Sequence, residues 1–131
     1  MLARRRKLLT AIVASPLMVP ALLARNHPEP KGMFGLITRI NATPGARDRL
    51  AAILIEGSTS MQGCLGYVVA ADATDSAALW ITEVWTSAEL HKASLQLPQV
   101  REAMMTGRPL IAGFGERIQT TPLGGSGIAA A

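Results

Sequence analysis

The sequence predicts one α+β domain over residues 33–120, with its elements in the order β, α, β, β, α, β. Four segments alternate along the chain with the period of two that is typical of strands. The segments after the first and third strands repeat apolar residues at helical spacing. A chain of 131 residues has room for one core. This order is that of the ferredoxin-like, split βαβ arrangement, in which two helices cover one face of a four-stranded antiparallel sheet.

The first half of the domain is predicted to hold a strand and a helix. Residues 34–42 form the strand, because apolar residues from Phe34 to Ile40 fall on alternate positions. Thr43 and Pro44 then supply an N-cap and a first-turn proline, which predicts a helix over residues 44–57 that ends at Gly57.

The middle of the chain is predicted to form a hairpin. A strand over residues 64–71 is followed by the turn-forming residues 72–76 and by a strand over residues 78–85. Both faces of this third strand are mostly apolar, which predicts a layer on each side of it.

The last part is predicted to hold a broken helix and the fourth strand. Thr86 and Glu89 have the spacing of a capping box and open a helix to about Leu97. Pro98 restarts the helix, which stops at Gly107. Strict alternation from Leu110 to Ile118 predicts the strand, with Phe114 and Ile118 on one face and Arg117 on the other. Residues 121–131 read as a flexible tail.

The face of the sheet away from the helices has no cover in this arrangement. It would expose apolar strand residues to water, so a homodimer formed through the sheets is expected to bury it.

Residues 1–24 have the architecture of an export signal. A basic stretch, Arg4–Lys7, precedes an apolar segment and the small residue Ala24. Arg5 and Arg6 followed by Lys-Leu-Leu resemble a twin-arginine signal, which predicts a periplasmic or extracellular protein. Residues 25–32 read as a linker. The alternatives are an uncleaved membrane anchor and a cytoplasmic protein whose translation starts at Met33.

The charge of the chain excludes nucleic acid as an expected partner. The formal net charge is +4, but four of the 13 basic residues lie in Arg4–Lys7. The other nine balance the nine acidic residues, so residues 8–131 lack the cationic excess that tracks a phosphate backbone.

Three segments carry a family resemblance: residues 63–67 (Gly-Cys-Leu-Gly-Tyr), residues 83–91 from Glu83 to His91, and residues 107–111 (Gly-Arg-Pro-Leu-Ile). From Met33 to Gly124 the chain resembles the antibiotic biosynthesis monooxygenase family. The resemblance implies a dimeric α+β barrel whose subunits each hold an apolar pocket between sheet and helices. It also implies oxidation of electron-rich phenols, anthrones or quinols by O₂ without metal, haem or flavin.

The superfamily also contains haem-degrading enzymes, which use an Asn, a Trp and a His ligand. The corresponding positions here are Thr38, Trp85 and Met104, so the haem-degrading set is not retained. Some polyketide-modifying members place an Asn four residues before the Trp, where this chain has Ile81. The proton-handling role of that Asn therefore does not carry over.

His91 is the candidate catalytic base, because an imidazole takes up a proton near neutral pH. Four residues are candidates for binding an apolar aromatic substrate: Trp85, Glu83, Ser94 and Arg108. Each also has a structural reading. Trp85 would be a core residue, Glu83 would pair with Arg39 or Arg117, and the others would be ordinary surface or helix residues.

No metal site is predicted, because two His and one Cys do not supply three convergent ligands. Cys64 is the single cysteine, so no disulfide forms within the chain. The leading hypothesis is a cofactor-independent monooxygenase acting on a quinol or related phenolic. The alternatives are a non-catalytic, dimeric ligand-binding domain and a haem-binding or haem-degrading protein.

Overall fold

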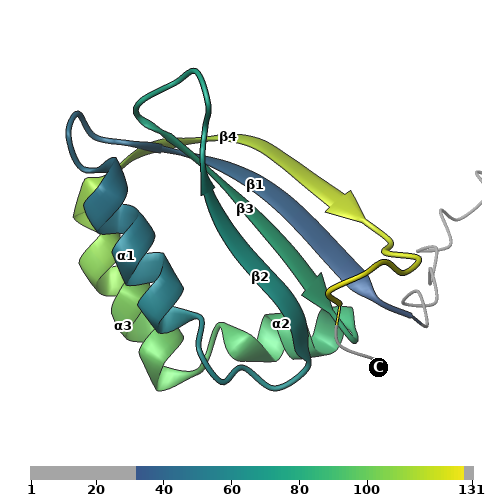
Figure 1. Cartoon of the computed structure of the whole chain (residues 1–131). Coiled ribbons are helices and arrows are strands. Elements are labelled where there is room, and N and C mark those ends of the chain that lie inside the picture. The colour runs from purple at the N-terminus through teal and green to yellow at the C-terminus, as the bar shows by residue number, and fades with distance from the viewer. Residues whose placement is uncertain (1–31, 129–131) are drawn as a thin grey trace, which may run out of the picture.

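The computed structural model describes residues 32–128, which form a four-stranded antiparallel sheet in the order β2-β3-β1-β4 with its helices on one face (Figure 1). This arrangement confirms the predicted ferredoxin-like α+β fold. The elements are β1 (Phe34–Ala42), α1 (Arg47–Gly57), β2 (Cys64–Ala71), β3 (Ala78–Trp85), α2 (Ala88–Ser94), α3 (Pro98–Gly107), the short 3₁₀ turn η1 (Arg108–Leu110) and β4 (Ile111–Thr120).

The register of β1 decides which side chains face the helices. Leu36 lies opposite Glu83 of β3, and Thr38 lies opposite both Ile81 of β3 and Arg117 of β4. Directly opposed residues in antiparallel strands point to the same face of a sheet. The helix-covered face therefore carries a carboxylate on β3 and a guanidinium on β4, with β1 between them.

The core consists of two buried clusters on the helix-covered face. One lies against α1, and the other lies between the start of β1, the end of β3 and α2. Trp85, Leu50 and Leu79 are the largest side chains that are almost completely buried, and each stabilises the fold by about 1.5–3 kcal/mol. The clusters are Ile40, Ala42, Leu50, Leu79 and Ile81 in the first, and Phe34, Leu36, Met61 and Trp85 in the second.

The start of α1 differs from the prediction. The helix begins at Arg47 rather than at residue 44, because Thr43–Ala46 form a turn. The backbone N–H of Ala46 donates to the carbonyl of Thr43 at 3.0 Å, and Gly45 has φ +75°. Pro followed by Gly at positive φ is the signature of a type II turn, so Pro44 is the second residue of this turn instead of the first residue of the helix.

The cap of α2 is one residue later than predicted. Ser87 is the N-cap, and its hydroxyl accepts a hydrogen bond from the backbone N–H of Leu90 at 3.2 Å. Thr86 and Glu89 therefore do not form the predicted capping box. Helix α2 ends at Ser94, whereas Pro98 restarts the helix and Gly107 ends it, as predicted.

A bulge in β4 overturns the strict alternation expected for this strand. The pairing with β1 shifts between Thr38, which faces Arg117, and Ile40, which faces Phe114. The irregularity leaves Phe114 and Arg117 on the same, helix-covered face, and it leaves Ile118 on the other face.

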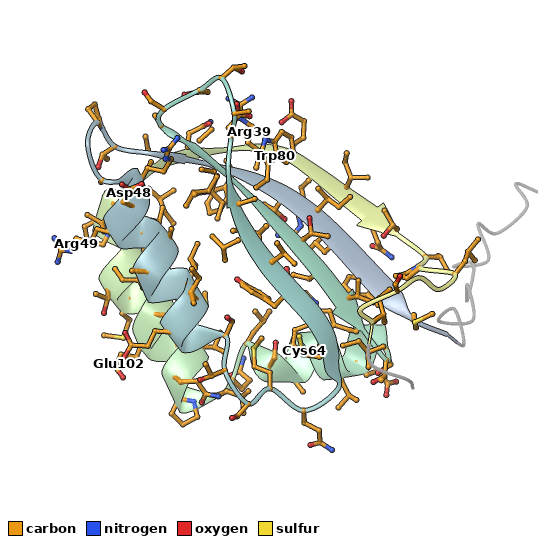
Figure 2. All side chains as sticks on the ribbon, in the orientation of Figure 1. Arg39, Asp48, Arg49, Cys64, Trp80 and Glu102 are labelled. Atoms are coloured by element: carbon orange, nitrogen blue, oxygen red, sulfur yellow. The ribbon has the colours of Figure 1, made fainter. Side chains whose placement is uncertain are left out.

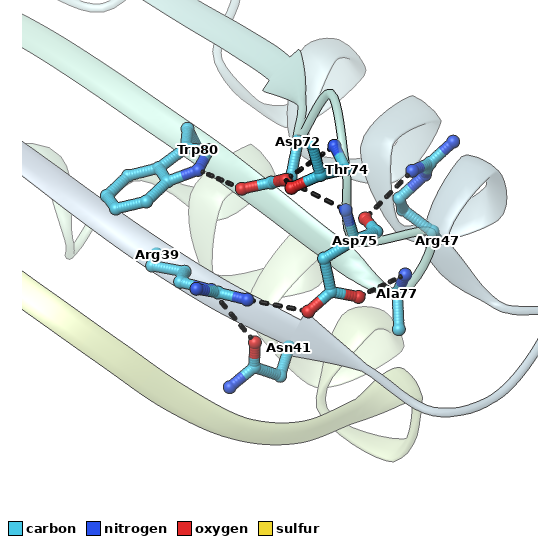
Figure 3. A network of polar contacts seen from close by, with 8 residues as sticks. All are labelled: Arg39, Asn41, Arg47, Asp72, Thr74, Asp75, Ala77 and Trp80. Atoms are coloured by element: carbon cyan, nitrogen blue, oxygen red, sulfur yellow. Dashed lines mark hydrogen bonds and ion pairs between the residues drawn. The ribbon is translucent and has the colours of Figure 1, made fainter.

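The opposite face of the sheet carries a polar network at the β2–β3 hairpin (Figure 3). The Trp80 indole N–H donates to Asp72 at 2.7 Å, and Arg39 forms an ion pair with Asp75 at 2.6 Å. The Arg39 guanidinium also lies 5.8 Å from the centre of the Trp80 ring. Arg39 therefore does not pair with Glu83, which is on the other face. Val68 and Ile118 are exposed here, and the homodimer remains a prediction.

The predicted ends of the chain are only partly described. The signal peptide over residues 1–24 lies outside the described residues, as does the linker over residues 25–32 except for Gly32. The predictions of export and of a start at Met33 stay predictions. Residues 121–128 of the predicted tail belong to no helix or strand.

Gly57 sets how closely α1 approaches α3, and we expect Gly57→Ala to destabilise the fold. A Cβ at this position would lie 2.5 Å from the Cβ of Ala103, so the helices must move apart. The overpacking should lower the free energy of unfolding by about 1–3 kcal/mol, measured by urea denaturation. Gly113→Ala is the matched control, because a Cβ there meets open space. A Gly57→Ala variant as stable as wild type would contradict this account of the helix contact.

Candidate functional site

A cavity of about 310 Å³ lies between the sheet and the three helices. Its walls are mostly aliphatic, and every strand and every α-helix contributes to them. The apolar lining residues are Leu36, Ile40, Leu54, Gly57, Met61, Ile81, Leu95, Val100, Ala103, Met104 and Phe114. The polar lining residues are Thr38, Ser58, Tyr67, Glu83, His91, Ser94 and Arg117. A mostly apolar cavity with a few convergent polar groups is typical of a small-molecule site.

His91 reaches this cavity from the middle of α2. Its side chain is 12% exposed and packs against two aromatic rings. The centre of the Phe34 ring lies 4.9 Å from that of His91, and the Trp85 ring stands edge-on at 5.5 Å. The cap at Ser87 fixes the start of the helix, so the backbone and the packing together hold the imidazole toward the cavity.

Glu83 lies on β3 beside His91 and is equally buried, with 12% of its side chain exposed. Its Oε1 accepts a hydrogen bond from the Trp85 indole N–H at 3.2 Å. The distance from Oε1 to Nε2 of His91 is 3.9 Å, which is too long for a hydrogen bond. Loss of hydration raises the pKa of Glu83, although the Trp85 hydrogen bond and the charge of Arg117 oppose the rise.

The environment of His91 favours its neutral form. Burial lowers the pKa of the imidazole, because a buried cation loses its hydration, and the positive charge of Arg117 lowers the pKa further. A neutral imidazole has one nitrogen free to accept a proton. The ring at this site is therefore available as a base near neutral pH.

Tyr67 is a polar residue of the cavity that the sequence analysis does not single out as functional. It lies opposite Glu83 in the β2–β3 pair and lines the cavity. Burial and the neighbouring Glu83 carboxylate raise the pKa of its phenol, so the hydroxyl stays protonated and can donate a hydrogen bond. Its position depends on the strand register, which no sequence motif encodes.

The structure brings three of the five predicted site residues to the cavity: His91, Glu83 and Ser94. The hydroxyl of Ser94 is buried and donates to the backbone carbonyl of His91 at 2.6 Å, so only its lone pairs are available to a ligand. Trp85 is completely buried behind His91 and does not line the cavity. Trp85 instead contacts His91 and Glu83, which do line the cavity.

Arg108 is not part of the cavity. It is exposed on η1 and borders a separate surface hollow with Arg101 and Met105. The arginine that does line the cavity is Arg117. Strict alternation put it on the opposite face from Phe114, and the β4 bulge instead places both on the helix-covered face. Thr38 and Met104, the positions compared with haem-degrading enzymes, also line the cavity.

Two other features of the described residues bear on function. Cys64, which lies at the start of β2 (Figure 2), has a thiol whose pKa is raised mainly by burial, so it is a poor nucleophile. Within residues 32–128, no group of three His, Cys, Asp or Glu side chains is placed to hold a metal ion. In the same part of the chain, every helix is too short or too polar to cross a membrane.

The Trp85 hydrogen bond to Glu83 gives a prediction that a matched pair of variants can test. Trp85→Phe removes the indole N–H and keeps an aromatic ring, so the pKa of Glu83 should rise further because burial is then opposed only by Arg117. A titration followed by ¹³C NMR of the glutamate carboxyls measures it. Trp80→Phe is the control, since its indole donates to Asp72 on the other face. If both substitutions raise the pKa of Glu83 equally, or if neither changes it, the assignment of the Trp85–Glu83 hydrogen bond is contradicted.

Comparison with known proteins agrees with the fold. A sequence profile of the antibiotic biosynthesis monooxygenase family matches residues 33–105. A candidate antibiotic biosynthesis monooxygenase from Chloroflexus aurantiacus J-10-fl is 60% identical, with a TM-score of 0.73 over 74% of this chain and 99% of that chain. Another, from Caulobacter crescentus CB15, is 16% identical, has a TM-score of 0.67 over 73% of this chain and 94% of that chain, and shares the fold alone. No curated protein matches. The chain belongs to the antibiotic biosynthesis monooxygenase family.

Proposed function

We propose that the protein is a cofactor-independent monooxygenase that oxidises a quinol, or a related phenolic or anthrone-type molecule, with O₂. The observation that carries the proposal is a mostly buried imidazole, biased toward its neutral form, on the wall of a mostly apolar cavity. Membership of the family supports the same reaction class. The proposal assigns the proton transfer to His91.

The cavity suits a small aromatic substrate. Its volume of about 310 Å³ lies at the lower end of the range for small-molecule sites, which begins at about 300 Å³. Aliphatic side chains such as Leu36, Ile81 and Val100 contact the ring faces. The Tyr67 hydroxyl can donate a hydrogen bond to a substrate oxygen, whereas the Ser94 hydroxyl, which already donates to the His91 carbonyl, can accept one from a substrate hydroxyl. A bound ring would displace water from the apolar walls, which strengthens the electrostatic interactions beside it.

Proton removal is the step that the protein accelerates. His91 accepts the proton from an acidic O–H or C–H bond of the substrate, which leaves an electron-rich anion. The carboxylate of Glu83, 3.9 Å from Nε2, stabilises the imidazolium that forms. Glu83 is a positioning and stabilising residue in this scheme, and Trp85 holds it in place through the indole N–H.

The substrate itself supplies the electrons. The anion transfers one electron to O₂, the two radicals combine to form a C–O bond, and the resulting peroxide loses water. For an anthrone, the CH₂ group becomes C=O, one oxygen atom enters the product and the other leaves in water. A quinol gives a hydroxyquinone and water with the same balance. No external reductant is needed in either case.

Oxygen uptake with menadiol or an anthrone tests the proposal. We expect wild-type protein to consume O₂ well above the rate of autoxidation and His91→Ala to lose about 100-fold or more of that activity, the usual contribution of a general base. Lys92→Ala is the control, because Lys92 is exposed on the same helix and does not line the cavity.

Two outcomes would count against the proposal. If the wild-type protein binds the substrate but gives no uptake above autoxidation, the cavity belongs to a non-catalytic binding domain. If His91→Ala and Lys92→Ala are equally active, the base has been assigned to the wrong residue.

A further inference from the structure

Arg117 stands apart from the polar groups that the proposed reaction uses. Among the described residues it is the only Arg or Lys that lines the cavity. It enters from β4, whereas Glu83 enters from β3 and His91 lies next to Glu83. Two strand spacings, about 10 Å, separate the backbones of β3 and β4, with Leu36 and Thr38 of β1 on the floor between them.

The guanidinium of Arg117 has no partner of its own within residues 32–128. No carboxylate lies within 4.0 Å of it, and no hydrogen bond from it is formed. Arg39, by contrast, is tied to Asp75 on the other face of the sheet. Arg117 is exposed as well as lining the cavity, and because no protein group occupies its donors, they can bind an anion that the ligand supplies.

The positive charge of Arg117 affects the ionisable groups of the cavity. It opposes the burial-driven rise in the pKa of Glu83, which lies across β1 from it, and it adds to the lowering of the pKa of His91. The remaining ionisable group on the walls is Tyr67, which stays neutral, and the lining residues of α1 and α3 carry no ionisable group. The base and the cation are thus on different sides of one mostly apolar space.

We propose that Arg117 binds and stabilises the negatively charged oxygen of the substrate anion. The site therefore selects molecules whose acidic group and charge-bearing oxygen lie across a ring from each other. This inference rests on the proposed function. His91 removes the proton at one side of the ring, and conjugation carries the charge to an oxygen beside Arg117. In an anthrone the CH₂ group and the carbonyl have this relationship. No bond other than that of the transferred proton breaks in the step.

A redox-inert probe separates this inference from oxygenation. In 4-nitrophenolate the charge is conjugated onto the nitro oxygens across the ring, whereas in 3-nitrophenolate it is not. Both phenolates absorb at longer wavelengths than their phenols, so absorbance with protein in excess gives the protonation midpoint of each bound probe. The full chain is used, and circular dichroism checks that each variant is folded.

For wild type we expect 4-nitrophenol to bind about tenfold more tightly as the phenolate than as the phenol, the scale of one hydrogen bond to a charged group. The bound midpoint should therefore lie below that of the free probe. We expect 3-nitrophenol to show a much smaller displacement. Arg117→Gln should abolish the preference for 4-nitrophenolate, and Arg117→Lys should restore part of it.

Arg49→Gln is the matched control, because Arg49 points outward from α1 (Figure 2) and does not line the cavity. It should behave as wild type. The inference is overturned if the preference survives in Arg117→Gln, if both nitrophenols shift equally, or if 4-nitrophenol does not bind. Oxygen uptake is scored separately: a phenolate preference without uptake defeats only the proposed function, and uptake without an Arg117-dependent preference defeats only this inference.

Discussion

The site depends on the burial of an imidazole and a carboxylate beside one indole ring. Trp85 is completely buried at the end of β3, donates its N–H to Glu83 and presents its edge to His91. Burial alone would raise the pKa of the carboxyl and lower that of the imidazole, and both directions are found. The indole N–H offsets part of the cost of burying the Glu83 carboxylate. The same carboxylate makes no hydrogen bond to His91, whose imidazole therefore stays neutral. The result is a base that is neutral and close to a group able to stabilise its cation.

The cavity exists because small side chains occupy positions where larger ones would fill the core. Gly57, Ser58, Ser94 and Ala103 all line it, and Thr38 takes a central place on β1. Protein interiors are otherwise close-packed, so a space of this size between sheet and helices needs such residues. The contact of Gly57 with Ala103 also joins α1 to α3, which means that the same small residues connect the helices and shape the cavity. Packing and binding are therefore linked at these positions.

Much of the fold follows from local patterns in the sequence. The limits of β2 and β3, the restart at Pro98 and the stop at Gly107 are as predicted, because period, proline and glycine act locally. The predicted start of α1 is wrong, because Pro44 and Gly45 together form a turn that the proline alone does not indicate. The cap at Ser87 was missed by one residue because Thr86 is also a capping type.

The site was predicted less completely, for physical reasons that differ between residues. His91, Glu83 and Ser94 line the cavity, whereas the place of Arg117 depends on a bulge and that of Tyr67 on the pairing of two strands. The account's central claim is that His91 is buried and neutral beside the cavity. ¹H–¹⁵N NMR titration of its imidazole, assigned with His91→Gln, measures this directly. The account predicts a midpoint below the ordinary histidine value of about 6.5, rising in Arg117→Gln. A midpoint at or above that value, unaffected by Arg117, would contradict it.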